Sequence, residues 1–201
     1  MDKHHLRAIL KKRRASFSPQ ERSEASSAVC QRLCREEWWQ MAQIAHIYCS
    51  FGTEVETGSL IAEAFAAQKR VIVPIAEPDT TTLLHTEITP QTLFRADDWG
   101  IPIPSQTRAD SHCIPQTIMS AQDCIIIPLL GFDAQLHRLG YGRGYYDRFL
   151  ATFLAEERTK PHFIGLAFAE QFVGDGVRAE KHDIPLDMVV TEQGIIRRGG
   201  D

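Results

Sequence analysis

The sequence lacks any apolar run that approaches the roughly 20 residues needed to cross a bilayer. Its first 14 residues contain no apolar core of the secretory type. They are basic, as mitochondrial targeting segments are, but they include Asp2, and no serine precedes Ser16. We therefore expect a cytoplasmic protein with no membrane partner.

The sequence is also poor in cysteine, and its five cysteines follow no spacing typical of a zinc site. Cys30 and Cys34 are one helical turn apart, a spacing that more often reflects shared packing than a shared metal. This use of cysteine indicates a reducing compartment.

Internal repeats and low-complexity linkers are absent as well. The chain has 201 residues, 43% hydrophobic and 24% charged, which is typical of a soluble domain with a sizeable core. We expect one domain over residues 1–201, present as a monomer. The formal net charge of −4 provides no general attraction to nucleic acid, so we expect no nucleic-acid partner.

Basic charge is concentrated at the start of the chain, where residues 1–14 carry six Lys/Arg and one acid. On a helix over 3–15, Leu6, Ile9 and Leu10 form an apolar stripe that can dock on the domain. The adjacent arc of this helix is basic and consists of Lys3, Arg7, Lys11 and Arg14. The basic arc is either an anion site or a solvated helix face.

Apolar strands alternate with amphipathic helices along the chain, which predicts an α/β fold around a largely parallel sheet. The most apolar strand, 123–130, is expected at the centre of the sheet. The other expected strands are 44–50, 70–75, 82–88, 162–168 and 187–192, and the expected helices are 3–15, 18–36, 58–68 and 145–157. Ligands in such folds bind beyond the carboxyl ends of the strands.

Two helix starts have capping signals. Ser18 precedes Pro19, and Glu21 can complete a capping box with Ser18. Thr57 can cap the helix over 58–68. The buried faces are expected to be Ala25, Val29 and Leu33 in one helix and Leu60, Ile61, Ala64 and Phe65 in the other.

A glycine-rich loop, RLGYGRGYYD over residues 138–147, follows the expected central strand. It has neither the ending of a Walker loop nor the spacing of a dinucleotide fingerprint. The loop is either a tight turn or an anion site, in which Arg138, Arg143 and backbone N–H groups converge on phosphate. A helix beginning at Tyr145 would direct its positive end to the same place.

Acidic residues near this rim have two possible roles. Asp147 lies in the first turn of the helix, where it either complements the helix dipole or binds Mg²⁺ through oxygen. Asp183 and Asp187 are candidates of the same kind, with turn capping as the alternative.

The segment 51–57 follows the first strand and also lies on a rim. Phe51, Glu54 and Glu56 suit a flat, nitrogen-rich heterocycle, because the ring stacks and a carboxylate accepts N–H donors. Thr57 and the two glutamates could equally form a helix N-terminal cluster.

These motifs resemble those of the 5-formyltetrahydrofolate cyclo-ligase family, also called methenyltetrahydrofolate synthetases. The strongest match is PLLGFDAQLHRLGYGRGYYDRFL (128–150), with Leu136 in place of a glycine of the family pattern. Further matches are KHHLR (3–7), EVET (54–57), VIVP (71–74), WGIPIP (99–104), GLAF (165–168), KHDIPLD (181–187) and VVTE (189–192). If position 136 requires a positive φ angle, the turn has been rebuilt around leucine.

The resemblance implies a three-layer α/β/α fold similar to the isomerase and CoA-transferase type. It implies ATP- and Mg²⁺-dependent conversion of 5-formyltetrahydrofolate to 5,10-methenyltetrahydrofolate, ADP and phosphate. Phosphoryl transfer to the formyl oxygen would create a leaving group for ring closure, and this step requires mainly positioning and charge neutralisation.

The resemblance also assigns residues to roles. It places ATP on Lys3, His4, His5, Leu6 and Arg7 and on Arg138, Leu139, Gly140, Tyr141, Gly142, Arg143, Gly144, Tyr145 and Tyr146. Arg138, Arg143 and Tyr146 are the expected catalytic residues, Asp147 and Asp183 the Mg²⁺ ligands, and Phe51 and Glu56 the folate contacts. Two rival functions are a sugar-phosphate isomerase on the same fold and a non-catalytic nucleotide- or folate-binding protein.

Overall fold

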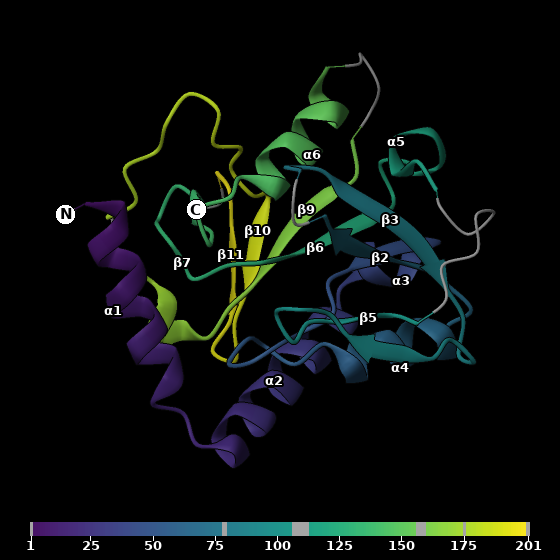
Figure 1. Ribbon diagram of the computed structural model, residues 1–201, viewed down its shortest axis with the longest axis horizontal. Coiled ribbons are helices and arrows are strands. Elements are labelled where there is room, and N and C mark those ends of the chain that lie inside the picture. Colours follow the sequence, from purple (N-terminus) through teal and green to yellow (C-terminus); the bar gives the residue numbers. More distant parts are fainter. Residues whose placement is uncertain (1, 78–79, 106–112, 156–159, 175, 200–201) are drawn as a thin grey trace.

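The fold is built around a seven-stranded sheet with the order β11-β10-β9-β6-β1-β2-β3 (Figure 1). A computed structural model describes residues 2–77, 80–105, 113–155, 160–174 and 176–199. The strands of the sheet are β1 (Ile44–Ile47), β2 (Arg70–Ala76), β3 (Leu83–Ile88), β6 (Cys124–Pro128), β9 (His162–Leu166), β10 (Met188–Val190) and β11 (Ile195–Arg197). The inner strands pair in parallel, and the edge strands β3 and β11 are antiparallel to their neighbours. The prediction of a largely parallel sheet with the 123–130 strand at its centre is confirmed.

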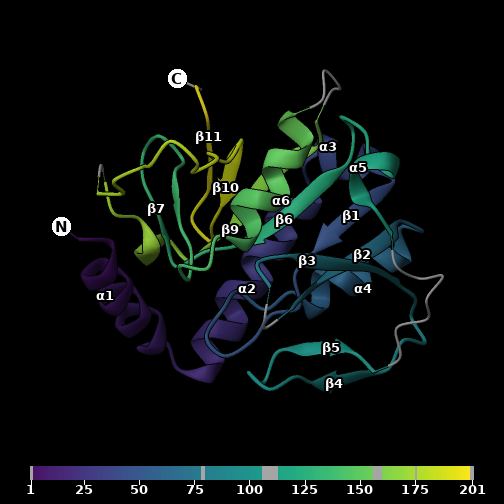
Figure 2. The ribbon, with the colours of Figure 1, turned by 45° about the horizontal axis from the view of Figure 1, so that its top comes forward.

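Helices cover both faces of this sheet, which confirms three layers (Figures 1 and 2). The longer helices are α1 (Lys3–Ala15), α2 (Pro19–Cys34), α4 (Gly58–Ala66) and α6 (Tyr145–Leu154), and the shorter ones are α3 (Glu37–Met41), α5 (Pro115–Ile118) and the 3-10 turn η2 (Ala169–Gln171). One core joins α2, α3 and α4 to the sheet, and a second joins α6 to the opposite face. None of the described helices is both long enough and apolar enough to span a membrane.

The predicted helix boundaries hold with small differences. α2 ends at Cys34 rather than near residue 36, and α6 ends at Leu154, while residues 156 and 157 of its predicted end lie outside the described residues. The Ser18 capping box is present, with hydrogen bonds of 3.2 Å and 2.8 Å between Ser18 and Glu21. All five cysteines are free thiols.

The prediction that the Thr57 side chain caps helix α4 is wrong. Thr57 occupies the N-cap position of α4, but its side chain makes no cap hydrogen bond. Its hydroxyl instead donates to the carbonyl oxygen of Tyr48 at 2.7 Å and accepts from the backbone N–H of Ser50 at 3.1 Å. Thr57 therefore fixes the chain after β1 rather than the start of the helix. Of the predicted inward residues of α2 and α4, Ala25, Ile61 and Phe65 are only partly buried.

Helix α1 docks on the domain, as its apolar stripe predicts. Leu6 and Leu10 are buried against Leu130 and Leu139, on the side of the molecule that carries the hairpin β7–β8 (Figure 2). The strands of this hairpin are β7 (Gly131–Phe132) and β8 (Arg138–Leu139). The basic arc is not wholly solvated, because Arg14 is buried with 5% of its surface exposed.

A second hairpin was not predicted. It consists of β4 (Phe94–Ala96) and β5 (Pro102–Pro104), which pair only with each other. All three residues of β4 are exposed, so neither strand shows an apolar alternation that identifies it in the sequence.

The turn between β7 and β8 accommodates leucine where the family pattern has glycine. Leu136 has φ of 62°, so this position does require the left-handed region. Asp133 holds the turn, because its Oδ1 accepts from the backbone N–H groups of Gln135 and His137 at 3.0 Å and 2.8 Å. The Leu136 side chain is completely buried in the core under α6. This burial offsets the unfavourable backbone conformation.

We predict that Leu136→Gly is less destabilising than Leu136→Ala. Both changes remove a buried side chain, at about 2–5 kcal/mol. Glycine also relieves the left-handed strain, which is worth about 1 kcal/mol. Urea unfolding of both variants measures the difference.

Leu130 provides the control, since it is fully buried and has no positive φ. Glycine should be worse than alanine there, by about 0.5–1 kcal/mol. The same order of stability at both positions would contradict the explanation of Leu136.

Candidate active site

A cavity of about 680 Å³ opens at the carboxyl ends of β1, β2 and β6. Tyr48 and Cys49 line it just after β1, Pro74 and Ala76 near the end of β2, and Pro128 at the end of β6. Its size lies within the range of about 300–1,000 Å³ that is typical of small-molecule sites. The position confirms the rim that the α/β pattern predicts.

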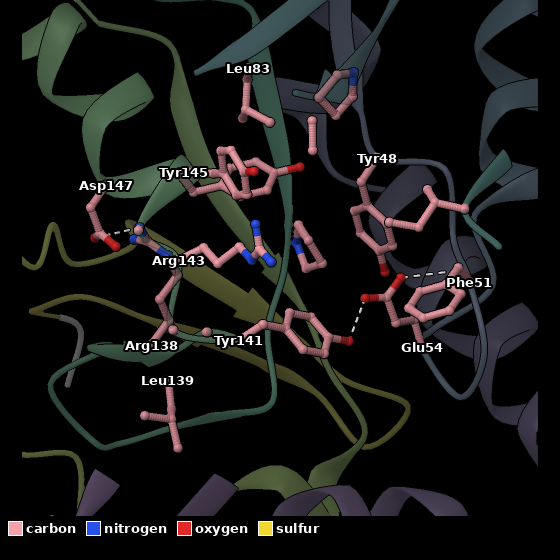
Figure 3. Close-up of a pocket in the computed structure, with 18 of the residues that line it drawn as sticks. Tyr48, Phe51, Glu54, Leu83, Arg138, Leu139, Tyr141, Arg143, Tyr145 and Asp147 are labelled. Atoms are coloured by element: carbon pink, nitrogen blue, oxygen red, sulfur yellow. Dashed lines mark hydrogen bonds and ion pairs between the residues drawn. The ribbon is translucent and has the colours of Figure 1, made fainter. Parts of the chain in front are cut away.

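The glycine loop forms one wall of this cavity (Figure 3). Gly142 and Gly144 have φ of 103° and 67°, angles that residues with a side chain rarely adopt. A Cβ atom at Gly142 would lie 3.3 Å from Cζ of Arg7, so helix α1 packs closely against the loop. Nε of Arg7 also donates to the carbonyl oxygen of Gly140 at 2.9 Å. The loop therefore depends on glycine for both its conformation and its contact with α1.

Helix α6 begins at Tyr145, as predicted, directly after this loop. Its N-cap residue is Gly144, which offers no side chain to the first N–H groups of the helix. Arg143 lies beside this helix start and places its guanidinium 5.0 Å from the centre of the Trp99 ring. The positive end of α6 thus faces the same wall as the loop.

A buried ion pair connects three segments at this wall. Arg138 of β8 donates to Oδ1 of Asp147 in α6, and it also donates to the carbonyl oxygen of Ile184. The backbone N–H of Ile184 in turn donates to Oδ1 of Asp147 at 3.2 Å. Burial lowers the pKa of Arg138, and the charge of Asp147 opposes this effect. Asp147 therefore does not only complement the helix dipole, because it also links Arg138 to the segment around Ile184.

Lys3 closes the next part of the wall. Its Nζ lies 2.8 Å from Oδ2 of Asp183 and 2.8 Å from Oε1 of Glu180. Burial raises the pKa of Asp183, but hydrogen bonds from Lys3 and from the backbone N–H of Glu180 outweigh it and leave the pKa below its usual value. Asp183 therefore stays ionised near neutral pH, next to the segment that Asp147 holds.

Phe51 and Glu54 lie at the opposite end of the cavity (Figure 3). Glu54 is 7% exposed, and its carboxylate accepts from the hydroxyl of Tyr141 at 2.5 Å and from the backbone N–H of Phe51 at 3.0 Å. Burial raises the pKa of Glu54, while the hydrogen bonds of Tyr141 and Phe51 and the charge of Arg14 oppose the rise.

Glu56, which the resemblance assigns to the folate, is not among the residues that line the cavity. Its Oε1 accepts from Nε of Arg22 in α2 at 3.2 Å, and 44% of its side chain is exposed. Although only two residues separate them, Glu54 and Glu56 bind different partners, Tyr141 and Arg22, and only Glu54 lines the cavity.

Two further side chains define the chemistry of the cavity. The buried hydroxyl of Tyr146 has no hydrogen-bond partner within the described part of the chain. Cys49 is unsuited as a nucleophile, because burial raises the pKa of its thiol to about 12. A buried hydroxyl without a partner is costly, so Tyr146 is suited to bind a ligand.

Most of the predicted residues meet in this one cavity. It is lined by Lys3, Arg7, Phe51, the complete run Arg138–Asp147 and Asp183. Three predicted residues do not line the cavity. His4 and His5 are exposed, and Leu6 is buried on the side of α1 that packs on the domain. Sequence reasoning missed Tyr48, Trp99 and Glu180, which do line it. The tryptophan of the WGIPIP segment was the one available signal for the β4–β5 hairpin.

Comparison with known proteins assigns the chain to a family. A sequence model of the 5-formyltetrahydrofolate cyclo-ligase family matches residues 1–192. The chain belongs to this family.

Two curated relatives and one solved structure match over nearly their full length. The mouse 5-formyltetrahydrofolate cyclo-ligase is 29% identical, over 94% of this chain and 93% of its own. The Escherichia coli K12 enzyme of the same name is 31% identical, over 91% and 96%. The NMR structure of Aquifex aeolicus 5,10-methenyltetrahydrofolate synthetase superposes with a TM-score of 0.79 at 26% identity, and covers 100% of this chain and 95% of that one.

Membership in the cyclo-ligase family makes the chain an enzyme that converts 5-formyltetrahydrofolate to 5,10-methenyltetrahydrofolate. It also makes ATP the co-substrate. The sugar-phosphate isomerase and the non-catalytic binding protein are not favoured by these comparisons.

We predict that Asp147→Asn destabilises the protein by about 3 kcal/mol, because it leaves the buried Arg138 without a counter-charge. The Arg138 side chain is only 4% exposed, and that of Asp147 is 21% exposed. Urea unfolding at neutral pH without added metal measures the loss.

Asp183→Asn is the matched control. Its partner Lys3 keeps a second carboxylate, the exposed Glu180 at 2.8 Å, so no buried charge loses its only partner and the loss should stay below about 1 kcal/mol. Equal losses in the free energy of unfolding would show that the Arg138–Asp147 pair stabilises the fold no more than the Lys3–Asp183 pair does.

Proposed function

We propose that the chain transfers the γ-phosphoryl group of ATP to the formyl oxygen of 5-formyltetrahydrofolate and then closes the ring. The phosphoryl group leaves ADP and forms a bond to the formyl oxygen. The neighbouring N10 attacks the activated carbon and loses its proton, and the carbon–oxygen bond breaks to release phosphate. The products are 5,10-methenyltetrahydrofolate, ADP and phosphate.

One observation carries this proposal: the residues at one end of the cavity are suited to bind an anion, and those at the other end are suited to bind a flat heterocycle. The anion end combines the glycine loop, the start of α6, and the side chains of Arg7 and Arg143. The other end combines the Phe51 ring with the Glu54 carboxylate. A reaction between a nucleotide and a folate needs both ends in one enclosure, so that the reacting atoms meet.

The nucleotide end supplies positioning and charge. Backbone N–H groups of the loop and the first turn of α6 can donate to phosphate oxygens, and Arg7 and Arg143 add charge-assisted bonds. The hydroxyl of Tyr146 has no hydrogen-bond partner among the described residues. We propose that it donates to the phosphoryl group during its transfer or to the formyl oxygen. Arg138 acts through Asp147, which it holds in place.

We propose Mg²⁺ as the metal, bound by Asp147 and Asp183. Within the described residues there is no cluster of three or more His, Cys, Asp or Glu side chains that could hold a metal. Mg²⁺ typically takes one or two carboxylates together with phosphate oxygens and water, and Asp147 and Asp183 are two carboxylates that line the cavity. Bound there, Mg²⁺ would neutralise charge on the β- and γ-phosphates.

The charge of the cavity lining supports a metal as well. Its described residues include four Lys/Arg and five Asp/Glu side chains: Lys3, Arg7, Arg138 and Arg143 against Glu54, Asp97, Asp147, Glu180 and Asp183. This lining has too little positive charge to balance a triphosphate alone. A divalent cation brought with the nucleotide supplies the missing charge.

The folate end supplies recognition. We propose that Phe51 stacks on the pterin ring and that Glu54, rather than Glu56, accepts its N–H donors. The five free thiols fit a reducing compartment, and we propose that the protein is cytoplasmic and monomeric.

The proposed function is tested by mixing the protein with 5-formyltetrahydrofolate, ATP and Mg²⁺ and following the near-ultraviolet absorbance of the methenyl product. One ADP should appear for each methenyl product. Turnover should stop without ATP and in the presence of EDTA. Product formation without ATP would exclude the phosphoryl-transfer mechanism, and binding of both ligands without any product would favour the non-catalytic alternative.

We predict that Arg7→Ala weakens ATP binding by about tenfold or more, because a charge-assisted contact to phosphate is worth about 1.5–3 kcal/mol. Lys12→Ala, an exposed position on the same helix, should change the affinity little. Calorimetry with ATP at fixed salt measures both. Equal behaviour of the two variants would mean that the basic arc of α1 is only a solvated face.

A further inference from the structure

We propose that Tyr141 and Arg14 are positioning residues that together aim the Glu54 carboxylate at the folate ring. This inference rests on the proposed function, which places the folate at Glu54. Neither residue has a role in the phosphoryl transfer described above.

The contact between Tyr141 and Glu54 crosses the cavity. Tyr141 stands between Gly140 and Gly142 in the nucleotide loop, yet its hydroxyl donates to Oε1 of Glu54 at 2.5 Å (Figure 3). Oε2 of Glu54 accepts from the backbone N–H of Phe51 at 3.0 Å. The carboxylate is therefore held at both oxygens, and each oxygen retains a lone pair for an N–H donor of the folate.

Arg14 fixes the tyrosine from behind. Its guanidinium donates to the hydroxyl of Tyr141 at 2.8 Å, to Oγ1 of Thr53 at 3.0 Å and to the carbonyl oxygen of Leu129 at 3.3 Å. It also lies 5.6 Å from the centre of the Tyr141 ring. Arg14 is buried, and a buried guanidinium tied to three segments has a fixed direction.

The hydrogen bonds form a chain from Arg14 through Tyr141 to Glu54. Because Arg14 donates to the phenol oxygen, the phenol proton is directed to the carboxylate. Burial and the charge of Glu54 raise the pKa of Tyr141 above its usual value, so the phenol remains a donor at neutral pH. The chain thus requires Arg14 as a cation, Tyr141 as a neutral donor and Glu54 as an anion.

Other ionisable groups near Glu54 do not supply this effect. Besides Arg14, the groups that face Glu54 or Tyr141 are Tyr48 after β1, Tyr146 of α6 and Lys11 of α1. Burial keeps the pKa of Tyr48 and of Tyr146 well above the usual range. The hydroxyl of Tyr48 donates to the carbonyl oxygen of Val55 instead. Lys11 reaches only the ring of Tyr141, at 5.9 Å.

The first experiment measures the affinity for 5-formyltetrahydrofolate by calorimetry, without nucleotide. Tyr141→Phe keeps the ring and removes the donor, and it should weaken folate binding by roughly five- to tenfold. Arg14→Met should weaken it as well, while Arg14→Lys, which keeps the charge, should recover part of the loss. Arg13→Met, at the exposed neighbouring position, is the control and should bind as the parent does.

The second experiment tests whether Tyr141 acts through Glu54. Glu54→Gln alone should weaken folate binding, and adding Tyr141→Phe to it should cause little further loss. Independent, additive losses would mean that Tyr141 touches the folate directly, and the proposal would be overturned.

The pH dependence separates a positioning role from general damage. The folded pKa of Glu54 is raised by burial, so folate affinity falls as pH drops through this pKa. Loss of the Tyr141 donor or of the Arg14 charge raises the pKa further. The pH at which affinity falls should therefore move upward in Tyr141→Phe and Arg14→Met, and stay unchanged in Arg13→Met. A variant that is weaker at every pH, with no shift in midpoint, contradicts the proposal.

The outcomes also separate this inference from the proposed function. If the parent protein forms no methenyl product and binds no folate, the proposed function fails whatever the variants do. If the parent binds and turns over folate, and Tyr141→Phe and Arg14→Met match it in affinity and pH midpoint, only the positioning role fails.

Discussion

The buried pair of Arg138 and Asp147 is the interaction on which the nucleotide side of the cavity depends. It joins the β7–β8 hairpin, the first turn of α6 and the segment around Ile184, which are distant in sequence. A desolvated guanidinium is costly unless it is paired and its donors are satisfied, and here Asp147 and the Ile184 carbonyl provide that compensation. The loop, the helix start and Asp183 keep their relative positions because these groups satisfy one another.

The features that the sequence predicts well are those with a local signal. The central strand is a continuous apolar run, α1 has a clear stripe, and the Ser18 capping box involves residues three apart. The glycine loop also has a local signal, because glycine adopts positive φ angles readily and Gly142 and Gly144 both have positive φ. The largely parallel sheet and the position of the rim follow from such signals, whereas the three layers and most of the predicted cavity lining follow from the resemblance to the family.

The features that the sequence does not predict depend on contacts between distant residues. Glu54 and Glu56 are equally plausible in a local view, and the choice between them is made by Tyr141, 87 residues away. Arg14 looks like a surface cation on a helical wheel, but Thr53, Leu129 and Tyr141 give it a buried polar environment. Thr57 occupies an N-cap position, but its hydroxyl donates to the carbonyl oxygen of Tyr48 instead of capping the helix. In each case a tertiary partner outweighs the local preference.

The docking of α1 has a consequence for the order in which the protein is assembled. Helix α1 completes the cavity only by contacting residues far along the chain: Lys3 pairs with Asp183, 180 residues later, and Arg7 binds Gly140, 133 residues later. Contacts of such large sequence separation form late, since long loops must close first. On the ribosome, α1 is synthesised well before Leu139 and Asp183, so its leucines stay uncovered until those residues have emerged. An uncovered apolar helix face of this kind is a site at which a chaperone can bind the nascent chain.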